Sequence, residues 1–235
     1  MTTTMGKPRP DHIAALTKGY HLPLDPLASQ HIAIILETVS RAWRELCGEG
    51  AVALTSGIEA EVNALLGPRL NRFRDFDPLW AALVSSVAQG RESINYNGTK
   101  LEPRPDMTFV LTRRNANFPL VAECKIIDHP NGKTVGLYCS KGIARFVRGD
   151  YAWASREAIM LGYVRDGSSV PLSLAPQLTS SAKASPDPLQ TTSHPRSRAD
   201  IHLAVHLTQH QRKFSYTVEV DGTGPGPINL FHLWL

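Results

Sequence analysis

The stretch PLVAECKII, residues 119–127, is the most strand-like run of the chain, and two charged residues interrupt it. Side chains two residues apart on a strand point to the same face, so Glu123 and Lys125 are expected to project together. Such a pair marks either a solvent-facing sheet edge or a functional site. A second β-rich run, DMTFVLT (residues 106–112), precedes it and is joined to it by the polar link RRNANF. The two runs are therefore predicted to form a β-hairpin.

Asp106 opens the first strand of this hairpin. Because the start of the first strand of a hairpin lies near the end of the second, Asp106 is expected close to Glu123 and Lys125. Carboxylate oxygens are the ligands that Mg²⁺ prefers. A bound divalent ion polarises a phosphodiester and lowers the pKa of a bound water. A neighbouring lysine can orient that water and offset charge in the transition state.

Pro105-Asp106, followed 17 residues later by Glu123-Cys124-Lys125, resembles the motif of the PD-(D/E)xK (restriction endonuclease-like) nuclease superfamily, over roughly residues 57–165. The tripeptide alone has little specificity, because a chain of this composition holds on the order of one acid-x-Lys by chance. A near-copy of the Pro-Asp stretch, KPRPDH, has no β-rich run after it. The context carries the resemblance, since the tripeptide lies in the hairpin and a helical run and another strand follow. The competing interpretation is a Glu–Lys pair that protects an edge strand from aggregation.

The resemblance implies an α/β fold whose central mixed sheet is flanked by helices. It implies a metal-dependent endonuclease with Mg²⁺ as cofactor, or Mn²⁺ in its place, acting on DNA, with RNA as the alternative. Asp106 and Glu123 would bind the metal and Lys125 would assist the attacking water. A bacterial restriction or anti-phage defence role follows by association only. The alternative function is a non-catalytic nuclease-like fold that binds nucleic acid or a partner protein.

Many members of the superfamily add a glutamate from the helix before the hairpin, and Glu59 and Glu61 are the candidates here. At helical spacing Glu59 lies nearer than Glu61 to the centre of the apolar stripe of residues 56–73. A glutamate that reaches a site at the core edge should border that stripe, so Glu59 is predicted as the fourth catalytic residue. The alternative is that both are solvated charges in the first turn. The stripe consists of Ile58, Val62, Leu65, Leu66, Leu70 and Phe73.

Lys141, Arg145 and Arg148 fall at i, i+4 and i+7 of the predicted helix 140–156 and form one basic stripe. Beside a metal site, such a stripe could hold a phosphate backbone. An ordinary solvated helix face explains the stripe equally well.

Residues 166–199 are rich in Ser, Pro and Thr and are predicted to form a long loop. His194 and Arg196 near its end are further candidate phosphate contacts. The run 199–208 alternates strictly between apolar and polar residues, which predicts a half-buried strand. The series His202, His206 and His210 is therefore predicted to lie on the polar face of that strand, and this interpretation is favoured over a zinc site.

Two regions are predicted: an N-terminal arm and helix (1–56) and a nuclease-like domain (57–235). The second divides into a core (57–165), the long loop and C-terminal strands (200–235). Asp-Pro and Ser residues at candidate N-caps and glycines at candidate ends indicate further helices. These helices are 24–50 with Asp25 as N-cap, 56–73 with Ser56 as cap, and 76–90; the remaining strands are 157–164, 213–222 and 228–235.

The formal net charge of +4 and the pI of about 9.0 are compatible with a nucleic-acid partner without demanding one. The three cysteines form no CxxC pair, so a reducing cytoplasm is expected. The N-terminus lacks the apolar segment of a signal peptide, and no run approaches the ~18 apolar residues of a membrane span. An activating partner protein and a homodimer are both compatible with the sequence.

Overall fold

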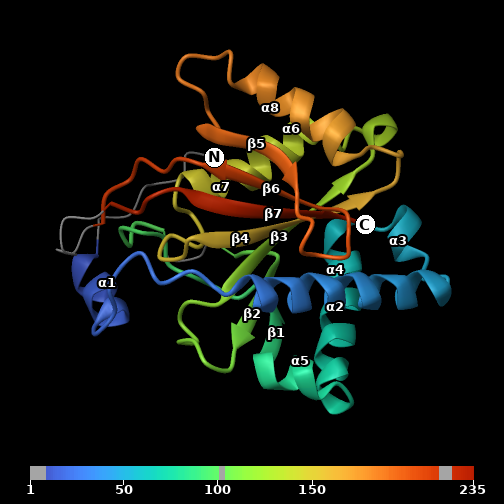
Figure 1. Ribbon diagram of the computed structural model, residues 1–235, viewed down its shortest axis with the longest axis horizontal. Helices are drawn as coiled ribbons and strands as arrows, with labels where there is room; N and C mark the ends of the chain where they lie inside the picture. The colour runs from blue at the N-terminus through green and yellow to red at the C-terminus, as the bar shows by residue number, and fades with distance from the viewer. Residues whose placement is uncertain (1–8, 101–103, 217–223) are drawn as a thin grey trace.

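The computed structural model describes residues 9–100, 104–216 and 224–235. The chain is an α/β protein in which helices precede and flank one seven-stranded mixed sheet of order β1-β2-β3-β4-β7-β6-β5 (Figure 1). The strands are β1 Val84–Gln89, β2 Met107–Leu111, β3 Leu120–Ile127, β4 Glu157–Val164, β5 Thr191–Ser197, β6 Val205–His210 and β7 Ile228–Trp234.

The predicted hairpin is confirmed as β2 and β3, which pair antiparallel with Met107 opposite Ala122. β4 runs parallel to β3, and β7 runs parallel to β4. The pairs β1–β2, β7–β6 and β6–β5 are antiparallel. The sheet is therefore mixed, as predicted, and the strands predicted at 157–164 and 228–235 are its two central neighbours β4 and β7.

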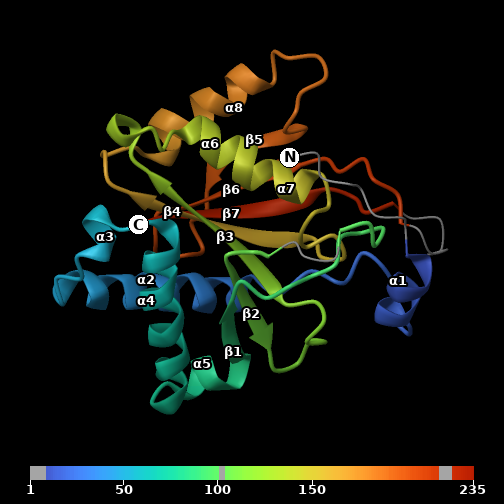
Figure 2. The ribbon, with the colours of Figure 1, turned by 180° about the vertical axis from the view of Figure 1, so that it is seen from behind.

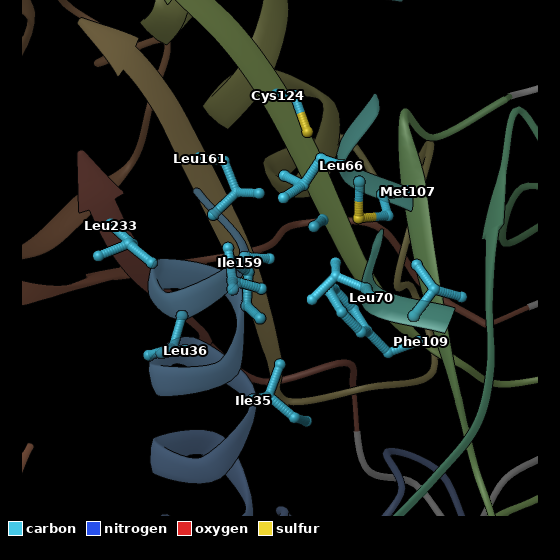
Figure 3. Packing of buried hydrophobic residues seen from close by; sticks show 14 of the residues in the cluster. Ile35, Leu36, Leu66, Leu70, Met107, Phe109, Cys124, Ile159, Leu161 and Leu233 are labelled. Atoms are coloured by element: carbon cyan, nitrogen blue, oxygen red, sulfur yellow. The ribbon is translucent and has the colours of Figure 1, made fainter. Parts of the chain in front are cut away.

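The larger core lies between one face of the sheet and the early helices (Figure 3). It joins Ile35 and Leu36 of α2 (Ser29–Gly48) to β4 and β7, while Leu66 and Leu70 of α4 (Glu59–Arg72) also contribute to it. Helix α5 (Pro78–Leu83) adds Trp80, whose indole N–H donates to Leu70 O at 2.8 Å. The short helix α3 (Ala53–Ser56) and the 3₁₀ turn Phe73–Asp75 complete this half. Helix α1 (Pro10–Thr17) instead contributes Ile13 to a smaller third cluster with Phe118 and Trp153.

The second core covers the other face of the sheet, under α6, α7 and α8 (Figure 2). Helix α6 (Val135–Tyr138) follows the 3₁₀ turn His129–Asn131 and continues through a π-helical turn, Cys139–Ile143, into α7 (Ala144–Val147). A second π-helical turn, Val170–Leu174, leads into α8 (Ala175–Ser181). Within the described ranges, no helix combines the length and apolar character needed to cross a bilayer.

The outer edge of β1 is closed by a side chain of α4. The Asn71 amide donates to Val87 O at 2.7 Å and accepts from Val87 N at 2.8 Å. These two bonds satisfy the backbone groups of Val87 that a further strand would otherwise use.

Three helix predictions in the N-terminal half are wrong in their limits. The helix predicted from Asp25 begins at Ser29, because tertiary hydrogen bonds from Leu27 N to Glu157 and from Arg114 to Asp25 O hold the preceding residues. Ser56 ends α3, and α4 begins at Glu59. The run 76–90 is helical only over α5 and then becomes β1, which pairs with β2. Two members of the predicted apolar stripe are exposed, namely Ile58 and Leu65.

The second half also departs from the pattern. The helix predicted at 140–156 begins earlier and ends at Val147, before Gly149, whose φ is +73°. The predicted loop 166–199 contains α8 and β5, because β5 pairs with the edge of β6. The strand predicted at 199–208 starts only at Val205. In the run 213–222, residues 213–216 form no strand, and 217–222 lie outside the described residues.

Gly162 lies in the middle of β4, where neighbouring side chains leave no room for a Cβ. A Cβ there would lie 2.7 Å from Trp234 Cδ1 and 3.0 Å from Ile127 Cδ1. Gly162→Ala is therefore expected to lower the free energy of unfolding in urea by about 1–3 kcal/mol. Gly48→Ala is the control, since nothing lies within 4 Å of a Cβ at that helix end. Equal stability of both variants would show that β4 and β7 adapt without cost.

Candidate active site

The candidate site lies just before Met107, the first residue of β2, where β3 continues without a partner from that strand. The last pair of the two strands is Met107 and Ala122, so beyond it the backbone of β3 has no partner from β2. Asp106, the residue before β2, takes that place: its Oδ2 accepts from Cys124 N at 2.8 Å. The end of the pairing thus fixes the Asp106 carboxylate beside the alternating side chains of β3.

The Lys125 ammonium is the centre of a cluster of three carboxylates. Its Nζ lies 2.9 Å from Glu123 Oε1, 3.1 Å from Asp106 Oδ2 and 3.2 Å from Glu59 Oε2. It also donates to Cys124 O at 2.6 Å. Burial opposes the charge of Lys125, but the negative charges of Glu123, Asp106 and Glu59 outweigh it and raise its pKa above the usual range. The four predicted catalytic residues therefore meet at one point.

Glu59 reaches the cluster from the first turn of α4. Besides its contact with Lys125, its Oε1 accepts from Ile126 N at 3.4 Å. Glu61 has a different role, because its Oε2 accepts from Ile58 N at 2.8 Å and so caps the start of the helix. The structure thus brings the favoured glutamate to the cluster and leaves the other outside it.

Glu123 is the most deeply buried member of the cluster, and its side chain is 0% exposed. Its Oε1 accepts from Lys125 and from Arg145, the latter at 2.8 Å. Its Oε2 is buried and has no hydrogen-bond partner in the part of the chain that the structure describes. Burial, together with the charge of Asp106, raises the pKa of Glu123 to about 7. Sequence periodicity could not show this unpaired oxygen.

Arg145 comes to Glu123 from α7, and a π-helical turn sets its position. Its NH1 also donates to Tyr151 OH at 2.7 Å, and that hydroxyl donates to Arg104 O at 3.0 Å. The π-helical turn packs tightly here, since a Cβ on Gly142 would lie 2.5 Å from Met160 Cε and 3.8 Å from Glu123 Cγ. Turns of this kind occur frequently at functional sites.

The structure does not keep the predicted basic stripe together. Lys141 is exposed within the π-helical turn, and Arg148 is exposed beyond the end of α7, where it pairs with Asp150 at 3.0 Å. The π-helical turn breaks the regular helical spacing on which the stripe depends. Only Arg145 of the three joins the carboxylate cluster.

His194 and Arg196 lie far from the cluster. Both are exposed on β5, the outermost strand at the opposite edge of the sheet. Four strand spacings separate β5 from β3, which amounts to roughly 19 Å. These residues do not join the other predicted site residues.

His210, the last of the three predicted histidines, belongs to a buried chain of hydrogen-bonded polar side chains. Tyr138 OH lies 2.7 Å from His232 Nδ1, whose Nε2 lies 2.7 Å from Thr208 Oγ1. The same hydroxyl lies 2.8 Å from His210 Nε2. Burial lowers the pKa of His210 to about 4, so both rings are neutral at pH 7. His210 is therefore interior, rather than on a solvated polar face as predicted.

A polar groove of about 620 Å³ opens beside Glu59. Its lining includes the start of α4, Ile126 of β3, and the cations Lys133 and Arg165. Arg165 also donates to Leu54 O and Gly57 O, which fixes the end of α3. Neither cation is predicted from the sequence, although the turn residues 129–132 before Lys133 are a signal that the chain folds back there.

The oxygen donors of the cluster suit a hard cation. Among the described residues, no group of three or more His, Cys, Asp or Glu side chains is arranged to hold a metal ion. Instead, the ammonium of Lys125 lies among the three carboxylates. Mg²⁺, however, is usually bound by one or two carboxylates plus waters and substrate phosphates. Asp106 and the unpaired Oε2 of Glu123 fit that requirement.

The chain was compared with protein-family models, with curated proteins and with solved structures, and no match was found.

Arg145→Gln is expected to raise the pKa of Glu123 above about 7, because burial remains while one of two cations on Oε1 is lost. A charge at this distance usually shifts a pKa by about one unit or more. The carboxyl ¹³C chemical shift of Glu123, followed against pH in the metal-free protein, measures it. Arg148→Gln is the matched control, since Arg148 pairs with Asp150. An unchanged Glu123 titration in both variants would contradict a role for the Arg145 charge.

Proposed function

We propose that the protein is a metal-dependent nuclease with a restriction endonuclease-like core and a PD-(D/E)xK-type site. The observation that carries this proposal is the convergence of Asp106, Glu123 and Lys125, with one buried carboxylate oxygen that no described residue pairs with. A buried acidic oxygen without a donor is costly unless a ligand satisfies it. A cation is the ligand that a carboxylate oxygen accepts best.

Asp106 and Glu123 would hold Mg²⁺, or Mn²⁺ in its place. When bound, the ion polarises the phosphodiester and lowers the pKa of a bound water. Lys125 orients the attacking water and offsets the charge that develops on the phosphoryl oxygens. Glu59 positions the Lys125 ammonium through their contact at 3.2 Å.

The groove beside Glu59 would hold the nucleic-acid backbone. Lys133 and Arg165 lie on its lining and can contact phosphates, which would make binding depend on salt. DNA is the proposed substrate, and a restriction or anti-phage defence role remains a proposal by resemblance alone.

A second candidate function is a non-catalytic module that binds nucleic acid. The observation in its favour is the ammonium of Lys125, which contacts all three carboxylates and, together with Arg145 on Glu123, offsets part of their charge without a metal. This ion cluster would then only stabilise the end of β3.

Incubation with supercoiled plasmid and with labelled single- and double-stranded oligonucleotides separates the two functions. The nuclease predicts cleavage with Mg²⁺ or Mn²⁺ and none with EDTA. The binding module predicts retention of the oligonucleotides in a gel-shift assay with no cleavage under any of these conditions.

A further inference from the structure

A second cavity, of about 240 Å³, adjoins the carboxylate cluster on the same face of the sheet. Its lining includes Thr108 of β2 and Val121 of β3, which lie opposite each other in the strand register. Thr108 lies two residues from Asp106, and Val121 lies two residues from Glu123, so each is about 7 Å along the strand from that carboxylate residue. Pro105, the neighbour of Asp106, also lines the cavity. A molecule in the cavity would thus lie directly beside the proposed reaction centre.

Two aromatic residues, Phe118 and Trp153, belong to the cavity lining. Phe118 and Trp153 are both buried, and their ring centroids lie 5.8 Å apart at an interplanar angle of 88°. The Trp153 indole N–H donates to Ile94 O at 2.7 Å, so its polar atom is satisfied, and its ring also packs against Tyr216 with centroids 6.1 Å apart. Flat aromatic walls favour a flat aromatic ligand.

The wall is held in place by a buried arginine. Arg212 is 2% exposed and donates to Ala152 O at 3.1 Å, Trp153 O at 3.3 Å and Gly226 O at 3.0 Å. Ala152 itself has a φ of +47°, a left-handed conformation that these contacts maintain. The backbone of this wall is therefore held in place before any ligand binds, which lowers the entropic cost of binding.

The polar groups on the cavity lining are mostly uncharged. Ser155 brings a hydroxyl that can both donate and accept, and Asn117 brings an amide. The Thr108 hydroxyl already donates to Ala88 O at 3.3 Å, so it can serve a ligand as an acceptor. Ser155 is 3% exposed, and its backbone N–H donates to Ala152 O. The charged residues of the lining, Arg91 and Glu92, are both exposed at the rim. This lining suits a neutral ring with its own donors and acceptors.

We propose that the cavity receives one unstacked nucleobase of the substrate, next to the phosphate that is cleaved. This inference rests on the proposed nuclease function. The volume of the cavity lies below the range of about 300–1,000 Å³ that is typical of ligand pockets, so the occupant is small. Because unstacking a paired base costs a few kcal/mol, the protein should prefer single-stranded or distorted nucleic acid.

Single-stranded oligonucleotides bound in EDTA test the pocket without requiring cleavage. One nucleotide at a time is replaced by 2-aminopurine, or by an abasic site in a second series. At one position of the oligonucleotide, 2-aminopurine emission should change on binding, and when Mg²⁺ is added this position should lie next to the phosphate that is cleaved. The abasic site at that position should weaken binding by about 5- to 150-fold, the range for a stacked base. Equal affinity for every abasic oligonucleotide would overturn the proposal.

Ser155→Ala connects the signal to this cavity. It should weaken binding of the intact oligonucleotide by about 3- to 10-fold, the value of one hydrogen bond, and leave the abasic affinity unchanged. Ser193→Ala on β5 is the matched control and should alter neither. Equal loss for both oligonucleotides in Ser155→Ala would overturn the assignment.

A position-specific signal without cleavage by Mg²⁺ would reject the nuclease function alone, whereas cleavage without any base-dependent binding would reject the pocket alone. The absence of oligonucleotide binding would overturn both.

Discussion

Lys125→Met is expected to lower the rate of Mg²⁺-dependent cleavage by about 10²- to 10⁴-fold, the range for a group that handles charge or a proton in the transition state. Methionine keeps the length of the side chain and removes only the ammonium that contacts Asp106, Glu123 and Glu59. Single-turnover cleavage of a labelled oligonucleotide measures the effect.

Metal binding separates a catalytic role of Lys125 from a merely structural one. Without the ammonium, only Arg145 on Glu123 remains to offset the charge of the carboxylates, which should bind Mn²⁺ as tightly as wild type or more tightly, by titration calorimetry. Lys183→Ala, at an exposed lysine beyond α8, is the control and should leave both readouts unchanged. Cleavage by Lys125→Met at the wild-type rate would reject the proposed role of Lys125. Loss of both cleavage and Mn²⁺ binding would assign Lys125 to structure instead.

Glu123→Gln is expected to gain stability relative to wild type as the pH rises. Burial raises the pKa of Glu123 from 4.5 to about 7, so the folded protein holds this proton where the unfolded chain has lost it. The stabilisation is complete below pH 4.5 and is lost as the pH rises through about 7. Glutamine resembles the protonated acid and does not titrate. Between pH 5 and 8 the unfolding free energy of wild type should fall by about 2–3 kcal/mol relative to the variant.

Urea unfolding with EDTA present at several pH values measures this difference. Asp77→Asn is the control with the opposite sign, because hydrogen bonds from Trp80 N and Arg41 lower the pKa of Asp77. Its stabilisation is lost only as the pH falls towards the lowered pKa, so its difference from wild type should stay flat between pH 5 and 8. A flat difference for Glu123→Gln as well would show that Glu123 ionises as freely as in the unfolded chain.

The sequence predicted best those elements whose signals are local. The hairpin of β2 and β3 followed from two β-rich runs and a polar link, and it brought Asp106 to Glu123 and Lys125. Helical geometry was enough to rank Glu59 above Glu61, because both lie on one regular helix whose buried face faces the sheet.

Elements that depend on distant partners could not be predicted in the same way. β1 continues an apparent helix, but the free edge of β2 draws it into the sheet. β5 lies in a segment of loop-like composition and forms because β6 offers an edge. The Arg145–Glu123 pair was missed because a π-helical turn alters the helical phase, and regular spacing cannot anticipate such a turn.

The two edge strands of the sheet, β1 and β5, bear on how copies of the chain can associate. At one end the Asn71 amide already uses the N–H and C=O of Val87. At the other end β5 carries Pro195, which has no N–H to donate, and its register with β6 is irregular. In the part of the chain that the structure describes, the row of free backbone groups is therefore interrupted at both edges of the sheet. A homodimer of this protein should therefore form through side-chain surfaces, and its sheets should remain separate rather than join into one continuous sheet.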